Sequence, residues 1–498
     1  MPVLFRLPGR RCRAAAWACL VALVAATAGG AVAAKPRPIA LSDCRLPHPL
    51  GEGSVPARCG TLEVPEDPGD PGGPTLTLSL AVAPAVDGRH AKEPLVIVAG
   101  GPGQSAKDFY AATAPAFAPI RQHRDLVLID QRGTGGSNRL QCDFPDDFEL
   151  SMPSPARIRE LSAECRRLLP GRPEFYTTSI AVQDLEAVRR ALGYERISLY
   201  GVSYGTRVVQ HYLRRYGQAA RAVVLDGVLA PDRALGPETP IDAERALRLT
   251  FARCAHDPAC AGAFPRLPER FEELRVALAR HPVHVSLADP SSGEARSVEF
   301  DEQQFVGAVR LLNYSSLSTA LLPLYIDRAA KGDYVPLAAQ LLMLTAHLDR
   351  EVAYGMNAAV VCSEDVPASA HVDRAALART YLGTSQLDGL EALCSGWPPG
   401  RVDPDLFAPL ASQVPALMLS GEADPVTPPA SAARAAEGFR DVLQVVVAGQ
   451  GHGQIGLPCA GRLIAKFLDL GTARGLDPGC LAKALPVPFV IDFSGPAP

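Results

Sequence analysis

The sequence predicts an α/β fold: a mostly parallel sheet flanked by helices, with an inserted and mainly helical cap. Short apolar runs rich in β-branched residues alternate with helix-compatible stretches in the first and last parts of the chain. That alternation is typical of a parallel sheet covered on both faces. Between these parts lies a long block in which helical periodicity dominates and the alternation is lost. A chain of 498 residues, 47% of them hydrophobic, is long enough for a large core with such an insertion.

The expected strands begin with an antiparallel pair, 59–65 and 75–82, joined by a turn rich in Pro, Gly and Asp. Further elements are expected as strands at 95–99, 126–130, 196–200, 222–226, 416–420 and 443–447, and as a helix at 180–192. Parallel strands end at one common edge, so the loops that follow them gather where ligands bind in such folds.

The domain boundaries follow from where the alternation stops. Residues 35–230 and 410–498 are expected to form the two parts of the sheet-containing core, and 231–409 the cap over its carboxyl edge. Within the cap we expect helices at 244–255, 268–279, 303–312 and 334–350, and a small hairpin of 283–287 with 296–300.

Residues 1–34 have the pattern of a signal peptide. Four arginines precede an apolar run at 14–28, and the small residues 31–33 offer a cleavage site. The alternative is an uncleaved anchor, but the run is shorter than the ~20 residues that a spanning helix needs. We therefore expect export, to a secreted or periplasmic location, with no stable membrane anchor after cleavage.

The cysteines agree with export. Of the twelve, Cys12 and Cys19 lie in the signal peptide, which leaves ten. An even number in an exported chain predicts disulfides, although spacing alone leaves their connectivity open. Our expectation is nearest-neighbour pairing, namely Cys44–Cys59, Cys142–Cys165, Cys254–Cys260, Cys362–Cys394 and Cys459–Cys480.

Composition also bears on partners and cofactors. The net charge of −4 leaves no basic surplus to suit nucleic acid. None of the Cys and His spacings is that of a zinc site, so we expect neither a metal nor another cofactor. The sequence leaves the oligomeric state open.

Residues 201–205, Gly-Val-Ser-Tyr-Gly, follow an expected strand and precede a helix-compatible stretch. This is the setting of a nucleophile elbow, a sharp turn that lifts the Ser203 hydroxyl clear of the sheet. Glycines on both sides suit a turn in which neighbouring backbone leaves no room for a Cβ. The pattern is short, so the rest of the chain has to support it.

A serine nucleophile needs a base and an orienting acid, which follow it in the order Ser, Asp or Glu, His in this kind of fold. Asp424 and His452 each lie in a loop after one of the last two expected strands. We expect His452 to take the Ser203 proton and Asp424 to fix the imidazole tautomer. Asp226 and Glu422 are the rival acids.

Two backbone N–H groups should stabilise the developing oxyanion. One is expected from Tyr204, directly after the nucleophile, and the other from Gly101, with Gly100 as the alternative. Asp130 and Arg132 are expected to form a buried pair that holds the loop after their strand.

Together these motifs resemble a known family. Residues 100–103 (Gly-Gly-Pro-Gly), residues 130–137 (Asp-Gln-Arg-Gly-Thr-Gly-Gly-Ser), the Ser203 elbow and the Asp424–His452 pair are similar to α/β-hydrolase serine peptidases of the proline iminopeptidase and tripeptidyl aminopeptidase branch. The resemblance extends from about residue 59 to the C-terminus and implies the α/β-hydrolase fold. The exported, cysteine-containing chain looks more like the tripeptidyl aminopeptidases than the smaller cytosolic iminopeptidases. Proline iminopeptidases usually have His before this glycine motif, where Ala99 stands, so strict proline specificity is not implied.

The resemblance implies an exported serine aminopeptidase that removes one residue or a tripeptide from the free N-terminus of a short peptide. The aminopeptidases have a cysteine-plus-acid segment similar to 358–365, so Glu364, or else Asp365, is expected to bind the substrate amine. The alternative for that segment is a solvated turn beside a disulfide. The alternative function is an esterase or amidase with the same triad, because the fold does not fix the substrate. A non-catalytic binding protein is disfavoured by the complete triad.

Overall fold

A nine-stranded sheet runs through the computed structural model, which describes residues 38–51, 53–142 and 153–496. The strand order is β1-β2-β3-β5-β4-β6-β7-β10-β11. Pairing is antiparallel from β1 to β5 and parallel from β5 to β11, which confirms a mostly parallel sheet. The strands are β1 (Ser42–Pro47), β2 (Ser54–Pro65), β3 (Thr75–Ala83), β4 (Leu95–Val98), β5 (Leu126–Ile129), β6 (Ile197–Val202), β7 (Ala220–Asp226), β10 (Ala416–Gly421) and β11 (Val442–Val447).

Every strand expected from the sequence is present, and the expected turn joins β2 to β3. β1 was not expected. Its sequence, Ser-Asp-Cys-Arg-Leu-Pro, is polar, and as the edge strand it pairs only with β2, so only Leu46 is buried.

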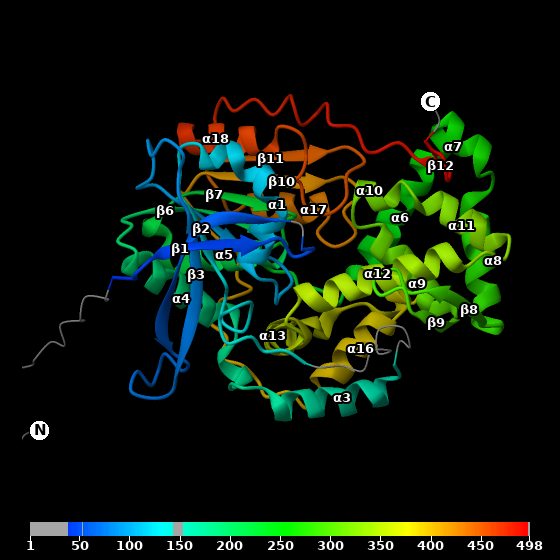
Figure 1. The fold of residues 1–498 in the computed structure, drawn as a ribbon, viewed down its shortest axis with the longest axis horizontal. Helices are drawn as coiled ribbons and strands as arrows, with labels where there is room; N and C mark the ends of the chain where they lie inside the picture. The colour runs from blue at the N-terminus through cyan, green and yellow to red at the C-terminus, as the bar shows by residue number, and fades with distance from the viewer. Residues whose placement is uncertain (1–37, 52, 143–152, 497–498) are drawn as a thin grey trace, which may run out of the picture. The chain divides into compact units, whose positions relative to one another are not determined.

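Alternate strand residues feed two separate cores, one on each face of the sheet. In β4, Val96 and Val98 belong to one core and Leu95 and Ile97 to the other, as the two-residue period of a strand requires. Helices α4 (Thr178–Ala191), α5 (Tyr204–Tyr216) and α17 (Pro429–Ala436) contribute to the first core, and α1 (Ala106–Arg121) and α18 (Ala460–Leu470) to the second. The sheet is therefore covered on both faces (Figure 1).

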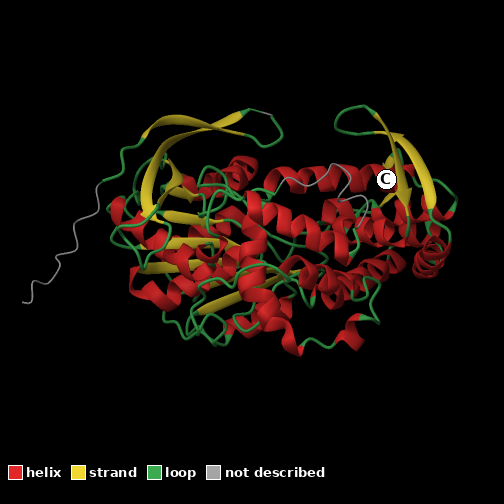
Figure 2. Cartoon of the chain, turned by 90° about the horizontal axis from the view of Figure 1, so that it is seen from below, coloured by secondary structure: helices red, strands yellow, loops and turns green. Residues whose placement is uncertain are grey.

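The segment between β7 and β10 is mainly helical, and Figure 2 shows its helices beside the strands of the sheet. Its principal elements are α6 (Thr239–His256), α8 (Leu267–Arg280), the hairpin of β8 (Val283–Ala288) and β9 (Ala295–Phe300), α9 (Glu302–Leu312), α11 (Leu322–Ala330), α12 (Val335–Glu351), α13 (Tyr354–Val360) and α16 (Ser385–Cys394). The expected helices and hairpin are all among them.

This inserted segment, residues 231–409, packs in two different ways. Helices α6, α8, α9, α11 and α12 surround a core of their own, which the chain's end also enters through Phe489. By contrast, residues Ala353 to Cys362 belong to the core of the sheet on the side of α4 and α5. Residues 353–362 of the insertion are thus built into the core of the sheet.

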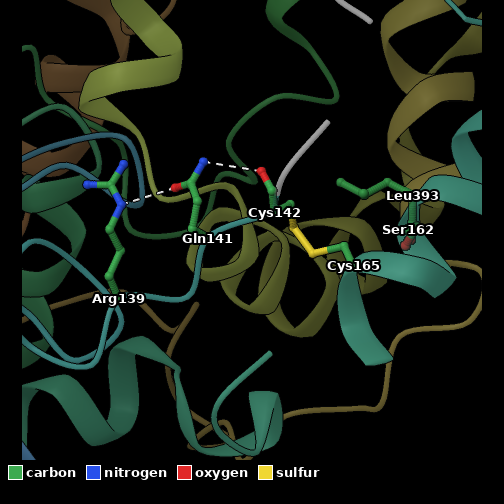
Figure 3. The surroundings of a disulfide bond; sticks show 6 residues. All are labelled: Arg139, Gln141, Cys142, Ser162, Cys165 and Leu393. Carbon is green, nitrogen blue, oxygen red and sulfur yellow. Dashed lines mark hydrogen bonds between the residues drawn. A yellow bond between two sulfur atoms is a disulfide. The ribbon is translucent and has the colours of Figure 1, made fainter. Parts of the chain in front are cut away.

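All five expected disulfides are formed. One of them, Cys142–Cys165, joins the loop after β5 to helix α3 (Pro155–Leu168), as Figure 3 shows. The Ser162 hydroxyl of α3 donates to the Leu393 carbonyl of α16 at 2.6 Å, which links α3 to the inserted segment. Within the described part of the chain, no helix is long and apolar enough to cross a membrane. The expected signal peptide, residues 1–34, lies outside the described residues.

Candidate active site

Ser203 stands between β6 and α5 in a conformation that side chains rarely adopt, with φ 55° and ψ −125°. Such backbone strain is typical of a nucleophile elbow. The turn is held because Ser203 N–H donates to the Asp226 carbonyl at the end of β7, at 2.9 Å. A Cβ on Gly201 would lie 2.6 Å from the Gly205 carbonyl oxygen, and one on Gly205 would lie 2.4 Å from that of Val98. The two flanking glycines are therefore required by close backbone packing, as expected.

Asp424 and His452 are brought together as the sequence predicts. They lie in the loops after the paired parallel strands β10 and β11, and His452 Nδ1 and Asp424 Oδ2 form a hydrogen bond of 2.8 Å. The fully buried Asp424 carboxylate also accepts from the N–H groups of Val426 and Thr427, both at 2.8 Å, and from the Thr427 hydroxyl at 2.9 Å. These four contacts fix the carboxylate against the imidazole.

The two groups shift each other's pKa. Burial lowers the pKa of the His452 ring, but the charge and hydrogen bond of Asp424 raise it more, so its pKa lies above the ordinary value. Burial raises the pKa of Asp424, but the charge and hydrogen bond of His452 lower it more, so its pKa lies below the ordinary value. Their contact thus favours an imidazolium beside a carboxylate, the state that forms when His452 takes a proton.

The imidazole reaches the edge of the sheet where Ser203 lies. Gly227 follows Asp226, whose carbonyl binds Ser203, and a Cβ on Gly227 would be 3.0 Å from His452 Cε1. Among the described residues, neither Ser203 Oγ nor His452 Nε2 has a hydrogen-bond partner, and the two are not bonded to each other. Catalytic hydrogen bonds of this kind are often long in a free enzyme and tighten on substrate binding.

The rival acids bind elsewhere. Asp226 is fully buried, and its carboxylate accepts from the Tyr200 hydroxyl at 2.8 Å and from the N–H groups of Gln454 and Ile455. Glu422 accepts from the Gly449 N–H at 2.9 Å. Asp226 thus holds the start of the chain segment that follows His452, and Asp424 alone of the three carboxylates is hydrogen-bonded to the imidazole.

The two groups expected to bind an oxyanion are placed beside the elbow. A Cβ on Gly100 would be 3.1 Å from Ser203 Cβ, so the loop 100–104 lies against the nucleophile. Gly101 has φ 102°, a conformation open to glycine. In the described part of the chain, the N–H groups of Gly101 and Tyr204 have no protein acceptor. Tyr204 is the first residue of α5, and the free N–H groups at the start of a helix can bind a negative charge.

Two ion pairs organise the loop after β5. The expected pair of Asp130 with Arg132 is not formed, so that prediction was wrong. Asp130 instead binds Lys107 Nζ at 2.9 Å, and its other oxygen accepts from the Ser105 hydroxyl at 2.8 Å. Arg132 binds both oxygens of Asp184, at 2.6 and 2.8 Å. Ser105 caps α1 directly after the Gly100 loop, so Asp130 supports that loop as well as its own.

Glu364 is buried, and its carboxylate contacts residues of α4 and α5. Its carboxylate accepts from the Thr178 N–H at 2.7 Å and hydroxyl at 2.9 Å, and Arg207 lies 3.3 Å away. Arg207 also binds Asp365 at 2.7 Å, and the Thr178 and Tyr204 hydroxyls are 2.8 Å apart. Burial raises the pKa of Glu364 to about 7, although Arg207 opposes the shift. Amine binding by Glu364 stays a prediction.

The inserted segment also contributes a contact that the sequence did not predict. The His452 N–H donates to the Tyr314 carbonyl at 2.7 Å, and a Cβ on Gly451 would lie 2.1 Å from the same oxygen. Nothing in the spacing of the inserted segment shows which of its residues meets the His452 loop.

Fold and site together define the class. The family model of the α/β-hydrolase fold matches residues 93–455, and the chain belongs to that family. Among similar proteins, Carboxylesterase B of Mycobacterium tuberculosis is 34% identical over 227 residues, covering 41% of this chain and 43% of that protein. Serine protease Hip1 of M. tuberculosis is 30% identical over 247 residues, covering 45% and 46%. Tripeptidyl aminopeptidase of Streptomyces lividans is 24% identical over 482 residues, covering 90% and 86%. The chain therefore spans less than half the length of the first two relatives and most of the third.

Proposed function

We propose that this chain is an exported serine aminopeptidase, which removes one residue or a tripeptide from a free peptide N-terminus through an acyl-enzyme on Ser203. The observation that carries the proposal is the Asp424–His452 hydrogen bond of 2.8 Å at the same sheet edge as the strained elbow. Nucleophile, base and orienting acid are the three groups that acyl transfer requires.

The chemistry follows from these positions. His452 Nε2 takes the Ser203 hydroxyl proton as Oγ attacks the scissile carbonyl carbon. The carbonyl oxygen becomes an oxyanion, which the N–H groups of Gly101 and Tyr204 stabilise. The C–N bond then breaks, and the imidazolium returns the proton to the leaving amine. Water repeats the sequence on the ester, releasing the acid and restoring Ser203.

Peptide substrates are favoured by the relatives. The match to Tripeptidyl aminopeptidase covers 90% of this chain, including the inserted segment, and a second relative is named a serine protease. The five disulfides support an exported location, since such bonds persist in oxidising compartments. The alternative, an esterase or amidase for small molecules, is supported by the relative named Carboxylesterase B.

Two measurements test the proposal. A fluorophosphonate probe should label the wild-type chain and Ser291→Ala, whose residue is exposed in the β8–β9 hairpin, but not Ser203→Ala. Labelling that persists in Ser203→Ala would reject the mechanism.

The second measurement compares aminoacyl and tripeptidyl anilides, N-acetylated peptides and short-chain esters side by side. The proposal expects unblocked peptides to have the highest kcat/KM. Faster turnover of esters than of every peptide would favour the esterase.

A further inference from the structure

Residues 351–357 of the inserted segment, which we call the strap, comprise the end of α12, the two residues after it and the first turn of α13. They lie along the loop 100–104. The Ala353 N–H donates to the Gly103 carbonyl at 3.0 Å. Gln104 pairs with Val352 as an isolated antiparallel bridge. A Cβ on Gly103 would lie 2.8 Å from the Ala353 carbonyl oxygen, so the two backbones meet as closely as glycine allows.

Side chains extend this contact to both ends of the strap. The Asn357 amide Nδ2 donates to the Pro102 carbonyl at 3.0 Å. At the other end, Gln104 Nε2 donates to Glu351 Oε2 at 2.9 Å. Three successive loop residues, 102 to 104, are thus each held by the strap.

These contacts reach the expected oxyanion donor through one peptide plane. The Gly100 carbonyl accepts from the Gln104 N–H at 3.3 Å. Because a peptide group is planar and trans N–H and C=O point in opposite directions, fixing that carbonyl also fixes the direction of the Gly101 N–H. The strap therefore determines where the Gly101 N–H points.

The strap is itself anchored on its far side. The Met356 N–H donates to the Leu140 carbonyl at 3.2 Å, and Arg139 Nη2 donates to the Val352 carbonyl at 3.3 Å. Ala353 and Met356 are fully buried in the core of the sheet. A strap held on both sides can position a loop, whereas a loose one would move with it.

We infer that Asn357 and Glu351 are positioning residues of the oxyanion hole, which hold the Gly101 N–H in place through Pro102 and Gln104. The inference rests on the proposed function of Ser203. It makes the inserted segment part of the catalytic apparatus of the sheet domain.

The test uses the second-order rate of labelling by a fluorophosphonate, whose phosphoryl oxygen occupies the oxyanion hole. Asn357→Ala should lower this rate, and kcat on p-nitrophenyl butyrate, about tenfold, with KM within about twofold, because misplaced donors stabilise the transition state less well. The labelled fraction at completion reports folding separately from rate. Gln386→Ala is the matched control, since it removes an amide-to-carbonyl bond of 3.1 Å to Gly236 within the same segment.

Glu351 supplies a second, independent pair of variants. Glu351→Ala should slow labelling, and Glu351→Gln should restore most of the rate, because its amide oxygen can still accept from Gln104. A charge-based role in substrate binding would predict no rescue by Gln.

Each outcome decides the inference. Slower labelling in Asn357→Ala and Glu351→Ala with a complete endpoint, an unaffected Gln386→Ala and rescue by Glu351→Gln supports it. Rates within twofold of wild type, or an equal loss in Gln386→Ala, overturn it. If Asn357→Ala does not fold, the Glu351 pair decides alone. Normal labelling of Ser203→Ala would instead overturn the proposed function.

Discussion

The ring of Tyr314 meets the ring of His452 edge to face, with centroids 5.8 Å apart, while the Tyr314 carbonyl accepts the His452 N–H at 2.7 Å. Tyr314 follows α9, so the inserted segment holds the imidazole by its backbone and by its ring. The strap holds the loop 100–104. The expected base and the expected oxyanion hole are therefore both held by contacts with the insertion.

Tyr314 should act through its ring. Tyr314→Ala is expected to lower kcat about fivefold, because the imidazole loses an aromatic contact of about 1 kcal/mol. Tyr314→Phe should stay near wild type, since among the described residues the hydroxyl has only Arg310 as a side-chain partner, at 3.4 Å. Steady-state kinetics on one anilide would check this. Equal losses in the two variants would show that the hydroxyl matters instead.

The pH profile should report the raised pKa of His452. The base has to be neutral, so kcat/KM falls as the pH drops through its pKa, and this acid limb should lie above the ordinary value of 6.5. Asp424→Asn removes the main group that raises the pKa of His452 and leaves only the smaller effect of Asp226 against burial, so the limb should move to lower pH. Its kcat should also fall about a thousandfold or more. An unmoved limb would mean that another group controls it.

The elbow should be less stable than a relaxed turn. The free energy of unfolding of Ser203→Gly should exceed that of Ser203→Ala by about 1 kcal/mol, because glycine adopts φ 55° without strain. Ser203→Gly should therefore have the higher Tm. Both variants lack the Ser203 hydroxyl, so the comparison isolates the effect of the backbone. Thermal unfolding would measure it, and a Gly variant no more stable than the Ala variant would contradict a strained turn.

Glu364 should make stability depend on pH. Its pKa is raised in the folded chain from 4.5 to about 7, so its stabilising contribution is complete below 4.5 and is lost as the pH rises through 7. Glu364→Gln should therefore reduce the Tm more at pH 5 than at pH 8. Arg207 pairs with Asp365 as well, which keeps it partnered in the variant. A Tm difference that grows toward pH 8 would contradict the raised pKa.

The same variant tests amine binding. Although the carboxylate already has Thr178 and Arg207 as partners, amine binding predicts that Glu364→Gln slows substrates with a free N-terminus more than N-acetylated ones. Equal losses would exclude Glu364 as the amine site. A loss confined to free N-termini would instead establish it.

Much of the fold and part of the site could be predicted from the sequence. Buried parallel strands have continuous apolar runs, which is why 95–99 and 416–420 stand out and β1, a polar edge strand, does not. Asp424 and His452 could be paired because each follows a strand of one parallel sheet and must reach the same edge.

The contacts that could not be predicted join segments far apart in the chain. Asp130 and Arg132 are two residues apart, but both lie in the loop after β5, where no strand period fixes their direction. Asp130 binds Lys107 and Arg132 binds Asp184. Asn357 and Tyr314 lie in the insertion. Helical periodicity there predicts which residues are buried, but it does not predict how the helices are placed against the edge of the sheet. Their roles depend on tertiary packing alone.

The division of the insertion between two cores limits how its sequence can be exchanged. Transplanting the whole of 231–409 from a relative would replace Ala353 to Cys362. The new side chains would then have to pack against α4 and α5, whose sequence did not change with them. Transplanting only α6 to α12 would mainly change a core that the sheet does not share, provided that Tyr314 and Glu351, which contact His452 and Gln104, are kept. In a hydrolase of this design the outer helices can therefore change in sequence around a fixed Tyr314, while residues 351–365 evolve together with the sheet.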